Sequence, residues 1–479
     1  MKTRVLTVAL FGLLTVGLYC PALPLDGEPY IHDPSTIMEC DGKYYTFGTG
    51  GGGLISEDGW TWRGGAERRG GGLAPDAVKI GDRYLISYTS RGGGLAGGHA
   101  GAINTMWANT FDPQSPDFGF NDDSVVITTD GIEDCDAIDP GFFLDPTNGR
   151  LYLVYGTFFG FIRQIELDPK TGKRINDDDP IDIAIDCEAT VMIYNDGWYY
   201  LLGTHGTCCS SANSTYNIRV GRSRNVSGPF VDHMGVDMLR GGGKLVIAAN
   251  GRNVGPGHFG LIDQGEDVQK FSFHYEADLG RGGRSVLAIR SLLWQDGWPI
   301  AGEDFGGGTF TIESVRSGFT LELGVEAVSL STTRPRRGET GPIAAIPDQD
   351  VAVVSQNWPA GDIEIRIADY MLQAHQKWTI TPVAGVGGYM GSPYFKITVA
   401  GTDRALAATK DIDVIAVPAF TGASEQLWQI DQLIDGTYRI MPKSLAKEGY
   451  ALTAVGRSTP SLTKFSAKNL AARWKLIAP

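Results

Sequence analysis

Residues 41–45 read Asp41-Gly42-Lys43-Tyr44-Tyr45, a glycine-centred turn that leads into a short aromatic segment. Related turns follow along the chain at Ile80-Gly81-Asp82-Arg83-Tyr84, Asn148-Gly149-Arg150-Leu151-Tyr152, Asp196-Gly197-Trp198-Tyr199-Tyr200 and, in weaker form, Gln264-Gly265-Glu266. The β-branched and aromatic segments beside these turns are too short for helices, and no amphipathic helix is evident. Irregular repeats of several strands are typical of propeller blades. The sequence therefore predicts an all-β, five-bladed β-propeller; an all-β sandwich is the alternative, but it does not explain the repeats.

Length, composition and charge limit the possible classes of protein. The chain has 479 residues, of which 42% are hydrophobic and 20% charged, so it can bury a large core and is not disordered as a whole. Its length favours two domains. The 65 glycines show no collagen period and agree with many tight turns. A net charge of −14 argues against nucleic acid as a partner.

The N-terminus has the pattern of a secretory signal peptide. Lys2 and Arg4 precede an apolar run over residues 5–19, and small residues follow near Ala22. The run is too short for a membrane span, and no other window is long and apolar enough for one. We therefore expect residues 1–22 to be a signal peptide and the protein to be secreted, into either the extracellular medium or a periplasm, with no membrane span.

Five of the six cysteines lie beyond this predicted signal peptide, and their spacing matches no zinc pattern. An odd number requires at least one free thiol. Cys208 and Cys209 are adjacent and could form a strained ring closed by a vicinal disulfide, or could remain two thiols. The sequence leaves these two alternatives open.

A polar residue stands a little upstream of each of the five turns. If each turn closes the first hairpin of a blade, these residues enter from equivalent innermost strands and converge on the mouth of the central channel; they are Asp33, Asp76, Asp139, Glu188 and His258. Gathering four carboxylates around one axis is electrostatically unfavourable and is not required by the fold. Aspartate is common in turns before proline, which would explain Asp33 and Asp139 individually. It does not explain why all five polar residues stand at a similar position before the turns. The pattern therefore predicts a functional site.

A series of motifs extends in order over roughly residues 28–305. These motifs are His32-Asp33-Pro34-Ser35, Ala137-Ile138-Asp139-Pro140, Leu151-Tyr152-Leu153-Val154-Tyr155-Gly156-Thr157, Glu166-Leu167-Asp168-Pro169-Lys170-Thr171-Gly172-Lys173, Tyr216-Asn217-Ile218-Arg219-Val220-Gly221-Arg222-Ser223, Gly255-Pro256-Gly257-His258 and Trp294-Gln295-Asp296-Gly297-Trp298-Pro299. Together they resemble the family 43 glycoside hydrolases, most closely their arabinan-degrading branch. The order of the motifs is more specific than any one of them.

This resemblance implies a five-bladed propeller that hydrolyses α-L-arabinofuranosyl linkages, with α-1,5 expected, in plant cell-wall polysaccharide or oligosaccharide. It assigns Asp33 as general base, Glu188 as general acid and Asp139 as the residue that orients the acid and raises its pKa. Inversion of configuration uses two opposed carboxyl groups ~6.5–9.5 Å apart. A nearby carboxylate raises the pKa of the acid through like-charge repulsion.

The resemblance also implies a metal position. His258 corresponds to a histidine that, in the arabinanase branch, reaches a metal ion in the channel, usually calcium with a largely water shell. A lone histidine is more often a hydrogen-bonded core residue, and calcium ordinarily prefers oxygen ligands. Calcium at His258 and an ordinary core histidine are therefore both open, and no other cofactor is expected.

Further residues are candidates for contacts with sugar. Thr157, Phe159 and His205 follow inner hairpins and, with Asp76, are predicted to bind substrate. Phe159 is the best candidate for a stacking platform, because C–H faces of sugars pack on aromatic rings. The sequence departs from the family where Leu73 replaces a tryptophan and where Ala189 follows the acid. These departures leave the chemistry intact but leave the sugar and the exo or endo mode open.

The pattern changes after residue 305. Three similar units end at Gln376-Lys377-Trp378, Gln426-Leu427-Trp428 and Ala472-Arg473-Trp474. They resemble a ricin-type β-trefoil, in which the Gln-x-Trp signature is a core element. The predicted domains are a propeller over residues 23–305 and a trefoil over 306–479. The resemblance implies carbohydrate binding by the trefoil, whereas a purely structural trefoil is the alternative, because a fold alone does not define a function.

Two other functions are compatible with parts of the pattern. A β-xylosidase or galactan hydrolase could use the same scaffold, and the glycoside or polysaccharide that is cleaved would distinguish them. A non-catalytic glycan-binding protein is the alternative from another class, and the intact set of Asp33, Asp139 and Glu188 argues against it.

Overall fold

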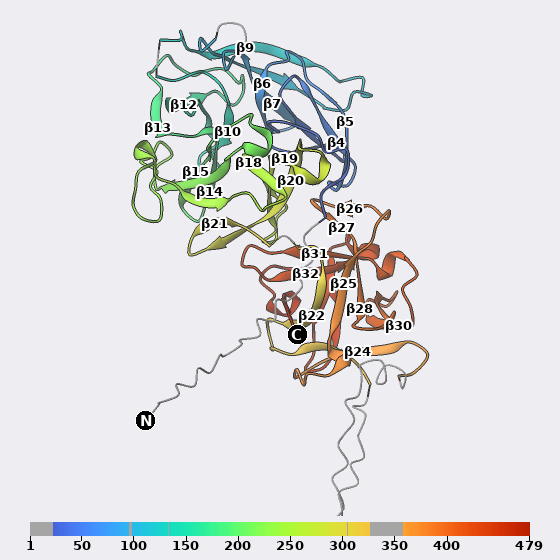
Figure 1. The fold of residues 1–479 in the computed structure, drawn as a ribbon. Coiled ribbons are helices and arrows are strands. Elements are labelled where there is room, and N and C mark those ends of the chain that lie inside the picture. The colour runs from blue at the N-terminus through green and yellow to red at the C-terminus, as the bar shows by residue number, and fades with distance from the viewer. Residues whose placement is uncertain (1–22, 95–97, 133, 304, 326–357) are drawn as a thin grey trace, which may run out of the picture.

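The computed structural model describes residues 23–94, 98–132, 134–303, 305–325 and 358–479, so the predicted signal peptide lies outside the described residues. The described chain consists of β-strands and short 3-10 turns. It forms a propeller and a separate C-terminal β-domain, which Figure 1 shows one above the other. None of its helices is long and apolar enough to cross a membrane.

Five sheets form the propeller, and in each sheet four strands pair in sequence order, with the first of these four innermost. Blade 1 contains β2 (Met38–Cys40), β3 (Lys43–Phe47), β4 (Gly52–Ser56) and β5 (Thr61–Glu67), with β1 (Asp26–Gly27) parallel to β5; blade 2 contains β6 (Leu73–Ile80), β7 (Arg83–Arg91), β8 (Ala102–Ala108) and β9 (Phe120–Thr128); blade 3 contains β10 (Gly141–Leu144), β11 (Leu151–Gly156), β12 (Phe161–Leu167) and β13 (Ile181–Ile185); blade 4 contains β14 (Glu188–Asn195), β15 (Trp198–His205), β16 (Asn217–Ser223) and β17 (Lys244–Ile247); blade 5 contains β18 (Asn253–Asp263), β19 (Gln269–Asp278), β20 (Arg284–Gln295) and β21 (Trp298–Ala301). The 3-10 turns η1 (Ser211–Asn213), η2 (Met238–Arg240) and η3 (Leu279–Arg281) lie in the connections. The predicted all-β, five-bladed propeller is confirmed.

The five predicted turns each join the first two strands of a blade. Their glycines all have positive φ, a region that glycine enters without a Cβ clash; they are Gly42, Gly81, Gly149, Gly197 and Gly265. We call the end of the propeller that carries these turns the hairpin face, and the opposite end, where the innermost strands begin, the channel mouth. Because neighbouring strands are antiparallel, the connections between second and third strands return to the channel mouth.

Apolar clusters fill the space between each pair of neighbouring blades and close the ring. Each of the five clusters draws buried side chains from two blades, and representative members are Tyr45, Leu153, Leu201, Phe273 and Trp62. The cluster around Trp62 joins blade 1 to blade 5, with Leu54 on one side and Leu287 on the other. Burial of such side chains stabilises the ring by about 1.5–3 kcal/mol each.

The C-terminal β-domain is built on six strands that pair in a closed ring. These strands are β22 (Gly308–Ser314), β25 (Trp378–Pro382), β28 (Phe395–Val399), β31 (Trp428–Gln432), β32 (Tyr438–Pro442) and β35 (Trp474–Ile477). Three hairpins follow in sequence between them, namely β23 (Thr320–Leu323) with β24 (Ile363–Ala368), β29 (Ala405–Ala408) with β30 (Val414–Val417), and β33 (Tyr450–Ala454) with β34 (Pro460–Lys464). A further small hairpin is formed by β26 (Gly388–Tyr389) and β27 (Ser392–Pro393), and the 3-10 turns are η4 (Ala374–Gln376), η5 (Ser424–Gln426), η6 (Lys443–Leu445) and η7 (Leu470–Ala472). A six-stranded ring with three hairpins is the arrangement that a β-trefoil has.

The three repeated tryptophans occupy equivalent positions in this domain. Each is fully buried, and each indole N–H donates to a leucine carbonyl, namely Trp378 to Leu321 at 2.8 Å, Trp428 to Leu406 at 3.0 Å and Trp474 to Leu452 at 2.8 Å. The side-chain oxygens of Gln376 and Gln426 accept backbone N–H groups at 2.8 and 2.6 Å. The signature therefore supports the core, and carbohydrate binding by this domain stays a prediction.

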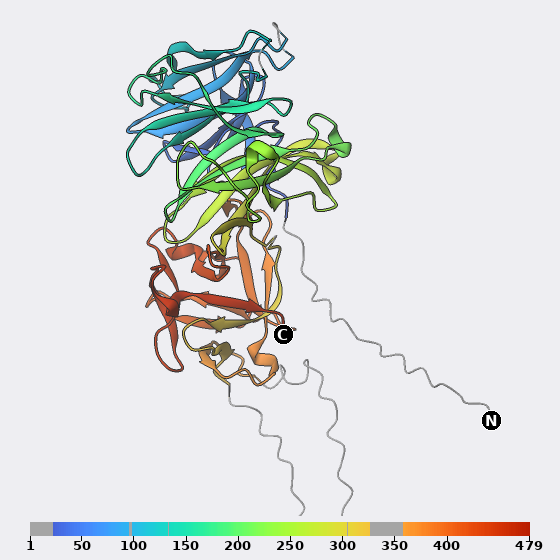
Figure 2. The same ribbon diagram turned by 90° about the vertical axis from the view of Figure 1, so that its left-hand side faces the viewer.

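The C-terminal β-domain packs against the hairpin face of blades 1 and 5. The backbone of Ile434 bonds to Asp267 and to Trp294, and the Gly388 N–H donates to Asp58 at 2.9 Å. These propeller residues lie at turns of the hairpin face or beside them. Figures 1 and 2 both show the domain below the propeller, on one side of it. None of these contacts between described residues involves the channel mouth.

A buried ion-pair network crosses the interface between the two parts of the chain. Asp431 of the C-terminal β-domain lies 3.0 Å from the Lys270 ammonium of blade 5 and 2.7 Å from the Arg439 guanidinium. Lys270 also donates to the Met390 carbonyl at 2.5 Å. Burial alone would raise the pKa of Asp431, but Lys270 and Arg439 hold it well below its usual range. The carboxylate therefore stays charged and compensates two cations.

We expect Asp431→Asn to destabilise the full-length protein by about 3–5 kcal/mol, because it leaves the buried Lys270 without a counter-charge. Urea unfolding at neutral pH measures this loss. Arg366→Gln is the matched control, since it breaks an exposed pair with Glu364 and should cost less than about 1 kcal/mol. Equal midpoints for Asp431→Asn and the wild type would show that the network does not hold the interface.

Candidate active site

Each blade has one non-glycine residue with left-handed backbone before or within its innermost strand. The residues concerned are Asp33 (φ 52°), Ala74 (φ 42°), Asp139 (φ 52°), Ala189 (φ 48°) and His258 (φ 59°). Non-glycine residues adopt this conformation at some energetic cost, and such strain concentrates at functional sites. In β6, β14 and β18 the strand register shifts at the same place. Bulges of this kind re-aim side chains, here at the mouth of the channel.

Asp33 stands just before β2 and is held from several sides. The Thr49 hydroxyl donates to its Oδ2 at 2.5 Å, and the Nδ1 atom of His32 lies 2.9 Å from the same oxygen. The Nδ1 atom of His258 lies 3.2 Å from Oδ1. The Asp33 backbone N–H donates to Nδ1 of His274 at 2.8 Å. Two predicted site residues, Asp33 and His258, are thus brought together.

His32, His274 and Glu276 complete this cluster, although no sequence pattern predicted a role for them. The Nε2 atom of His32 lies 2.9 Å from Glu276 Oε1, so the imidazole bridges two carboxylates. Burial lowers the pKa of His32, but hydrogen bonds to Asp33 and Glu276 outweigh it and raise the pKa to about 10. His32 is therefore an imidazolium at neutral pH.

The same contacts keep both carboxylates ionised. Burial would raise the pKa of Asp33, but His258 and the hydrogen bond from His32 hold it well below its usual range. Burial likewise opposes ionisation of Glu276, whereas His274 and His32 lower its pKa to about 2. His274 and Glu276 alternate along β19 and so share a face, a pattern of buried polar residues that the sequence could have revealed.

Glu188 and Asp139 differ from Asp33 and Glu276, because their surroundings raise the pKa and favour the protonated form. Glu188 is only 6% exposed, and the Tyr216 hydroxyl donates to its Oε1. Burial raises the pKa of Glu188 to about 7; Tyr216 lowers it, and repulsion from Asp33 and Glu276 adds to the rise. Burial and repulsion from Glu188 and Asp33 raise the pKa of Asp139 well above its usual range. The two groups titrate as a pair that retains a proton near neutral pH.

Asp76 has a structural contact that explains its burial. Its Oδ1 accepts the Thr36 backbone N–H at 3.0 Å, and its Oδ2 accepts the Phe142 N–H at 2.8 Å. The carboxylate thus ties blade 2 to blades 1 and 3 around the channel. A direct contact between Asp76 and sugar stays a prediction.

The other predicted substrate contacts lie at the channel mouth on blades 3 and 4. Thr157 follows β11 and is buried, and His205 ends β15 and is also buried. Burial, together with Arg219, lowers the pKa of His205 to about 4, so its ring is neutral at pH 7. Phe159 is 48% exposed and meets His99 edge-on at 4.8 Å. The Phe159 ring is therefore accessible to a ligand, whereas Thr157 and His205 lie beneath the surface.

The residues around His258 are a poor match to calcium. His258 is near one carboxylate, Asp33, and two further imidazoles, and burial lowers its pKa to about 4. Within the described residues, the groups that could hold a metal ion combine His32 with Asp33 and His274, or His32 with Cys208 and Cys209. Calcium prefers oxygen ligands, and these sets are rich in nitrogen and sulfur. Calcium at His258 stays a prediction, and no chemical step is derived from it.

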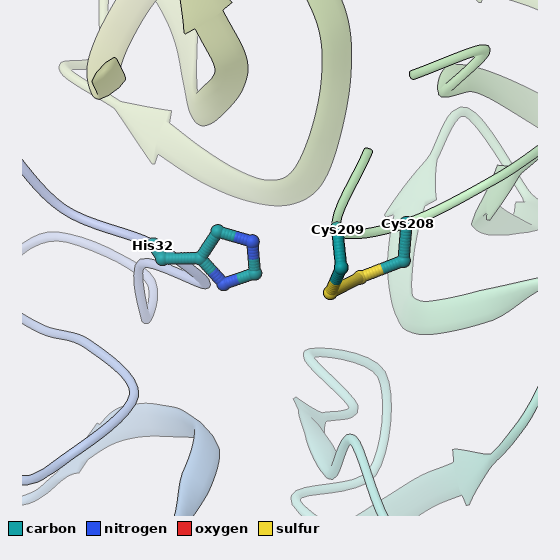
Figure 3. A group of neighbouring side chains, drawn as sticks. All are labelled: His32, Cys208 and Cys209. Atoms are coloured by element: carbon teal, nitrogen blue, oxygen red, sulfur yellow. A yellow bond between two sulfur atoms is a disulfide. The ribbon is translucent and has the colours of Figure 1, made fainter. Parts of the chain in front are cut away.

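Cys208 and Cys209 form a vicinal disulfide. It lies in the connection from β15 to β16 at the channel mouth, where Figure 3 shows the His32 ring directed toward it. Cys40, Cys135 and Cys187 are buried thiols, in agreement with the odd number of cysteines.

Comparisons with known proteins identify relatives of the propeller. The family described as glycosyl hydrolases family 43 matches residues 47–299, just over half of the chain. The extracellular exo-α-(1→5)-L-arabinofuranosidase of Cellvibrio japonicus is 30% identical over 61% of this chain and 91% of its own length. The extracellular endo-α-(1→5)-L-arabinanase 1 of Bacillus subtilis is 29% identical over 47% of this chain and 67% of its own.

Solved structures give the same relationship. The crystal structure of an exo-1,5-α-L-arabinanase from a bovine ruminal metagenomic library has a TM-score of 0.52 and 30% identity, and covers 58% of this chain and 99% of its own. A Cellvibrio cellulosa α-L-arabinanase complexed with arabinohexaose has a TM-score of 0.52 and 26% identity, and covers 57% of this chain and 95% of its own. From the family match, these relatives and the carboxylates at the channel mouth, we conclude that the chain is a glycosidase that belongs to the glycosyl hydrolases of family 43.

Proposed function

We propose that this enzyme hydrolyses α-L-arabinofuranosyl linkages of arabinan, with α-1,5 linkages expected, and inverts the configuration at the anomeric carbon. The observation that carries the proposal is the contrast between two carboxyl groups at the channel mouth: Asp33 lies 2.9 Å from the His32 imidazole, whereas Glu188 is buried against the Tyr216 hydroxyl. These surroundings favour an ionised Asp33 and a proton on the Glu188–Asp139 pair. Inverting hydrolysis needs one carboxylate and one carboxylic acid in this way. The relatives named arabinanase and arabinofuranosidase support the choice of sugar.

In the proposed reaction, Asp33 accepts a hydrogen bond from a water molecule on one face of the sugar ring. The water oxygen forms a bond to the anomeric carbon while the bond to the leaving oxygen breaks. The water proton passes to Asp33, and the Glu188 proton passes to the leaving oxygen. Proton exchange with solvent then restores both groups.

The low pKa of Asp33 is compatible with its role as a general base. The transition state of glycoside hydrolysis resembles an oxocarbenium ion, so the electron-poor carbon attracts the water before the water has lost its proton. A fully ionised but weak base is then sufficient. His32 and Thr49 keep that carboxylate charged and fix its direction.

Asp139 serves as the group that keeps the proton on the acid. Burial and the nearby Glu188 raise the pKa of Asp139, and since repulsion between two charges is mutual, Asp139 in turn favours the proton on Glu188. Removing the Asp139 charge would therefore release the Glu188 proton at a lower pH. This is positioning and electrostatic support, and it needs no contact with the bond that breaks.

Export to the extracellular medium or a periplasm is part of the proposal. The signal-like residues 1–22 and the Cys208–Cys209 disulfide both fit an oxidising compartment, and relatives are named extracellular. Arabinan in plant cell walls is the proposed substrate there.

A polysaccharide panel with product analysis tests the substrate and the stereochemistry. We expect linear α-1,5-arabinan to be cleaved and its first reducing product to be the β-anomer, as seen by proton NMR within the first minutes of reaction. Xylan, aryl β-xylosides and galactan serve as the comparison and should not be cleaved. Hydrolysis of a β-xyloside or galactan instead of arabinan, or an initial α-anomer, would refute the corresponding part of the proposal.

Substitution of each carboxyl group tests its role. Asp33→Asn and Glu188→Gln should each lower kcat on arabinan by about 10²–10⁴-fold without loss of folding. On an aryl arabino-oligosaccharide with an acidic phenol, Glu188→Gln should recover much of its rate, because that leaving group needs no proton, while Asp33→Asn should not. Glu39→Gln, an exposed residue of blade 1, is the control. Equal rates for all variants on arabinan would exclude these roles.

Tyr216→Phe tests the origin of the alkaline limb of the pH profile. Activity should fall as pH rises through about 7, because Glu188 loses its proton there. The Tyr216 hydrogen bond stabilises the ionised form, so its removal should move this limb about one to two pH units higher. Tyr199→Phe removes a hydroxyl that bonds Asp145 and should leave the limb in place. A limb that moves to lower pH would contradict the assignment.

A further inference from the structure

The vicinal disulfide is part of a connection that is fixed at many points. Hydrogen bonds close this connection on itself, from the Ser214 hydroxyl to the Thr207 carbonyl at 2.8 Å and from the Thr207 N–H to the Thr215 hydroxyl at 3.0 Å. The Ser211 hydroxyl donates to the Gly283 carbonyl of blade 5 at 3.3 Å. The disulfide is therefore held in one place relative to blades 4 and 5.

That place is next to the proposed catalytic groups. Both sulfur atoms and a ring nitrogen of His32 lie within 4.8 Å of one another, and His32 in turn contacts Asp33. The same connection ends at Tyr216, which bonds Glu188. The His32 side chain is 31% exposed and Cys209 is exposed, so this edge of the channel mouth is open to a ligand. Figure 3 shows the disulfide and the imidazole facing each other across this space.

Two ordinary roles do not explain the disulfide. A disulfide stabilises a fold mainly by closing a loop of the unfolded chain, and a bond between adjacent residues closes almost none. Its connection also contains two non-glycine residues in the left-handed region, Cys209 (φ 59°) and Ser211 (φ 50°), which is unfavourable. A metal site of His32 with the two cysteines would need thiolates, which disulfide sulfurs are not.

We propose that the Cys208–Cys209 disulfide forms a wall of the sugar-binding site and packs against the pentose bound next to Asp33. The inference rests on the proposed function and names a substrate contact for it. The disulfide offers a compact, polarisable, apolar edge that suits the C–H face of a furanose ring, while the neighbouring His32 and Asp33 offer polar partners for its hydroxyl groups. Because the connection is already fixed, binding orders no further backbone, which favours affinity.

Binding to an inactive enzyme tests this contact without turnover. We expect Glu188→Gln to bind a linear α-1,5-arabino-oligosaccharide in calorimetry, and Glu188→Gln with Cys208→Ser and Cys209→Ser to bind it about tenfold more weakly, as loss of an apolar contact predicts. In the active enzyme, the double serine variant should have a raised KM with kcat and the alkaline limb of the pH profile unchanged. An unchanged affinity, or a shifted limb that reports a disturbed Tyr216–Glu188 contact, would overturn the proposal.

Chemical reduction gives a second measurement that does not depend on folding of the variant. Tris(2-carboxyethyl)phosphine should weaken oligosaccharide binding by the Glu188→Gln protein to the same extent, with alkylation and mass spectrometry confirming two new thiols, and reoxidation should restore it. The reductant should not change binding by the double serine variant. Equal affinity of the reduced and the oxidised protein for the oligosaccharide would refute the proposal that the disulfide contacts the sugar. If no form binds arabino-oligosaccharide, the proposed substrate is wrong and this inference falls with it.

Discussion

Neighbouring carboxyl groups in a desolvated channel cannot all carry charge, and the chemistry of this glycosidase depends on how that conflict is resolved. The imidazolium of His32 lies between Asp33 and Glu276 and keeps both of them ionised. Within the described part of the chain no ion pair includes Glu188, whose hydrogen-bond partner is the neutral hydroxyl of Tyr216. Burial and the surrounding negative charge therefore leave the proton on the Glu188–Asp139 side. One bridging imidazolium thus separates a base from an acid.

The propeller makes this separation possible because it brings residues from five blades to one axis. Each blade has a residue with left-handed backbone before or within its innermost strand, and apolar clusters between all neighbouring blades hold the ring closed. The Asp33 backbone reaches His274, a residue 241 positions later, across the junction of the first and last blades. Asp76 adds a bond to each neighbouring blade. The positions of the site residues therefore depend on the contacts that close the ring of blades.

Much of this arrangement could be predicted from the sequence, because turn chemistry is local. The five glycine turns and the polar residue before each one indicated the blades and the residues at the channel mouth. His274 and Glu276 were missed because they lie on a second strand, away from the turns, and only ring closure brings them to Asp33. The state of Cys208 and Cys209 was left open, since adjacency permits a disulfide but the fixed connection around it determines the geometry. The contacts of Asp76 with two blades likewise depend on tertiary structure.

The fixed position of the C-terminal β-domain on the propeller has a consequence for how a long substrate would bind. This domain's buried ion pair and its backbone hydrogen bonds to blades 1 and 5 fix it against the propeller. A module on a flexible tether samples many separations from its partner, and its effective concentration depends on tether length. Here the contacts between the C-terminal β-domain and the propeller fix the distance between this domain and the channel mouth. If this domain bound a polysaccharide, its binding position would lie at a fixed distance from the channel mouth. The length and curvature of the polysaccharide, as well as its local chemistry, would then determine which bond reaches the catalytic groups.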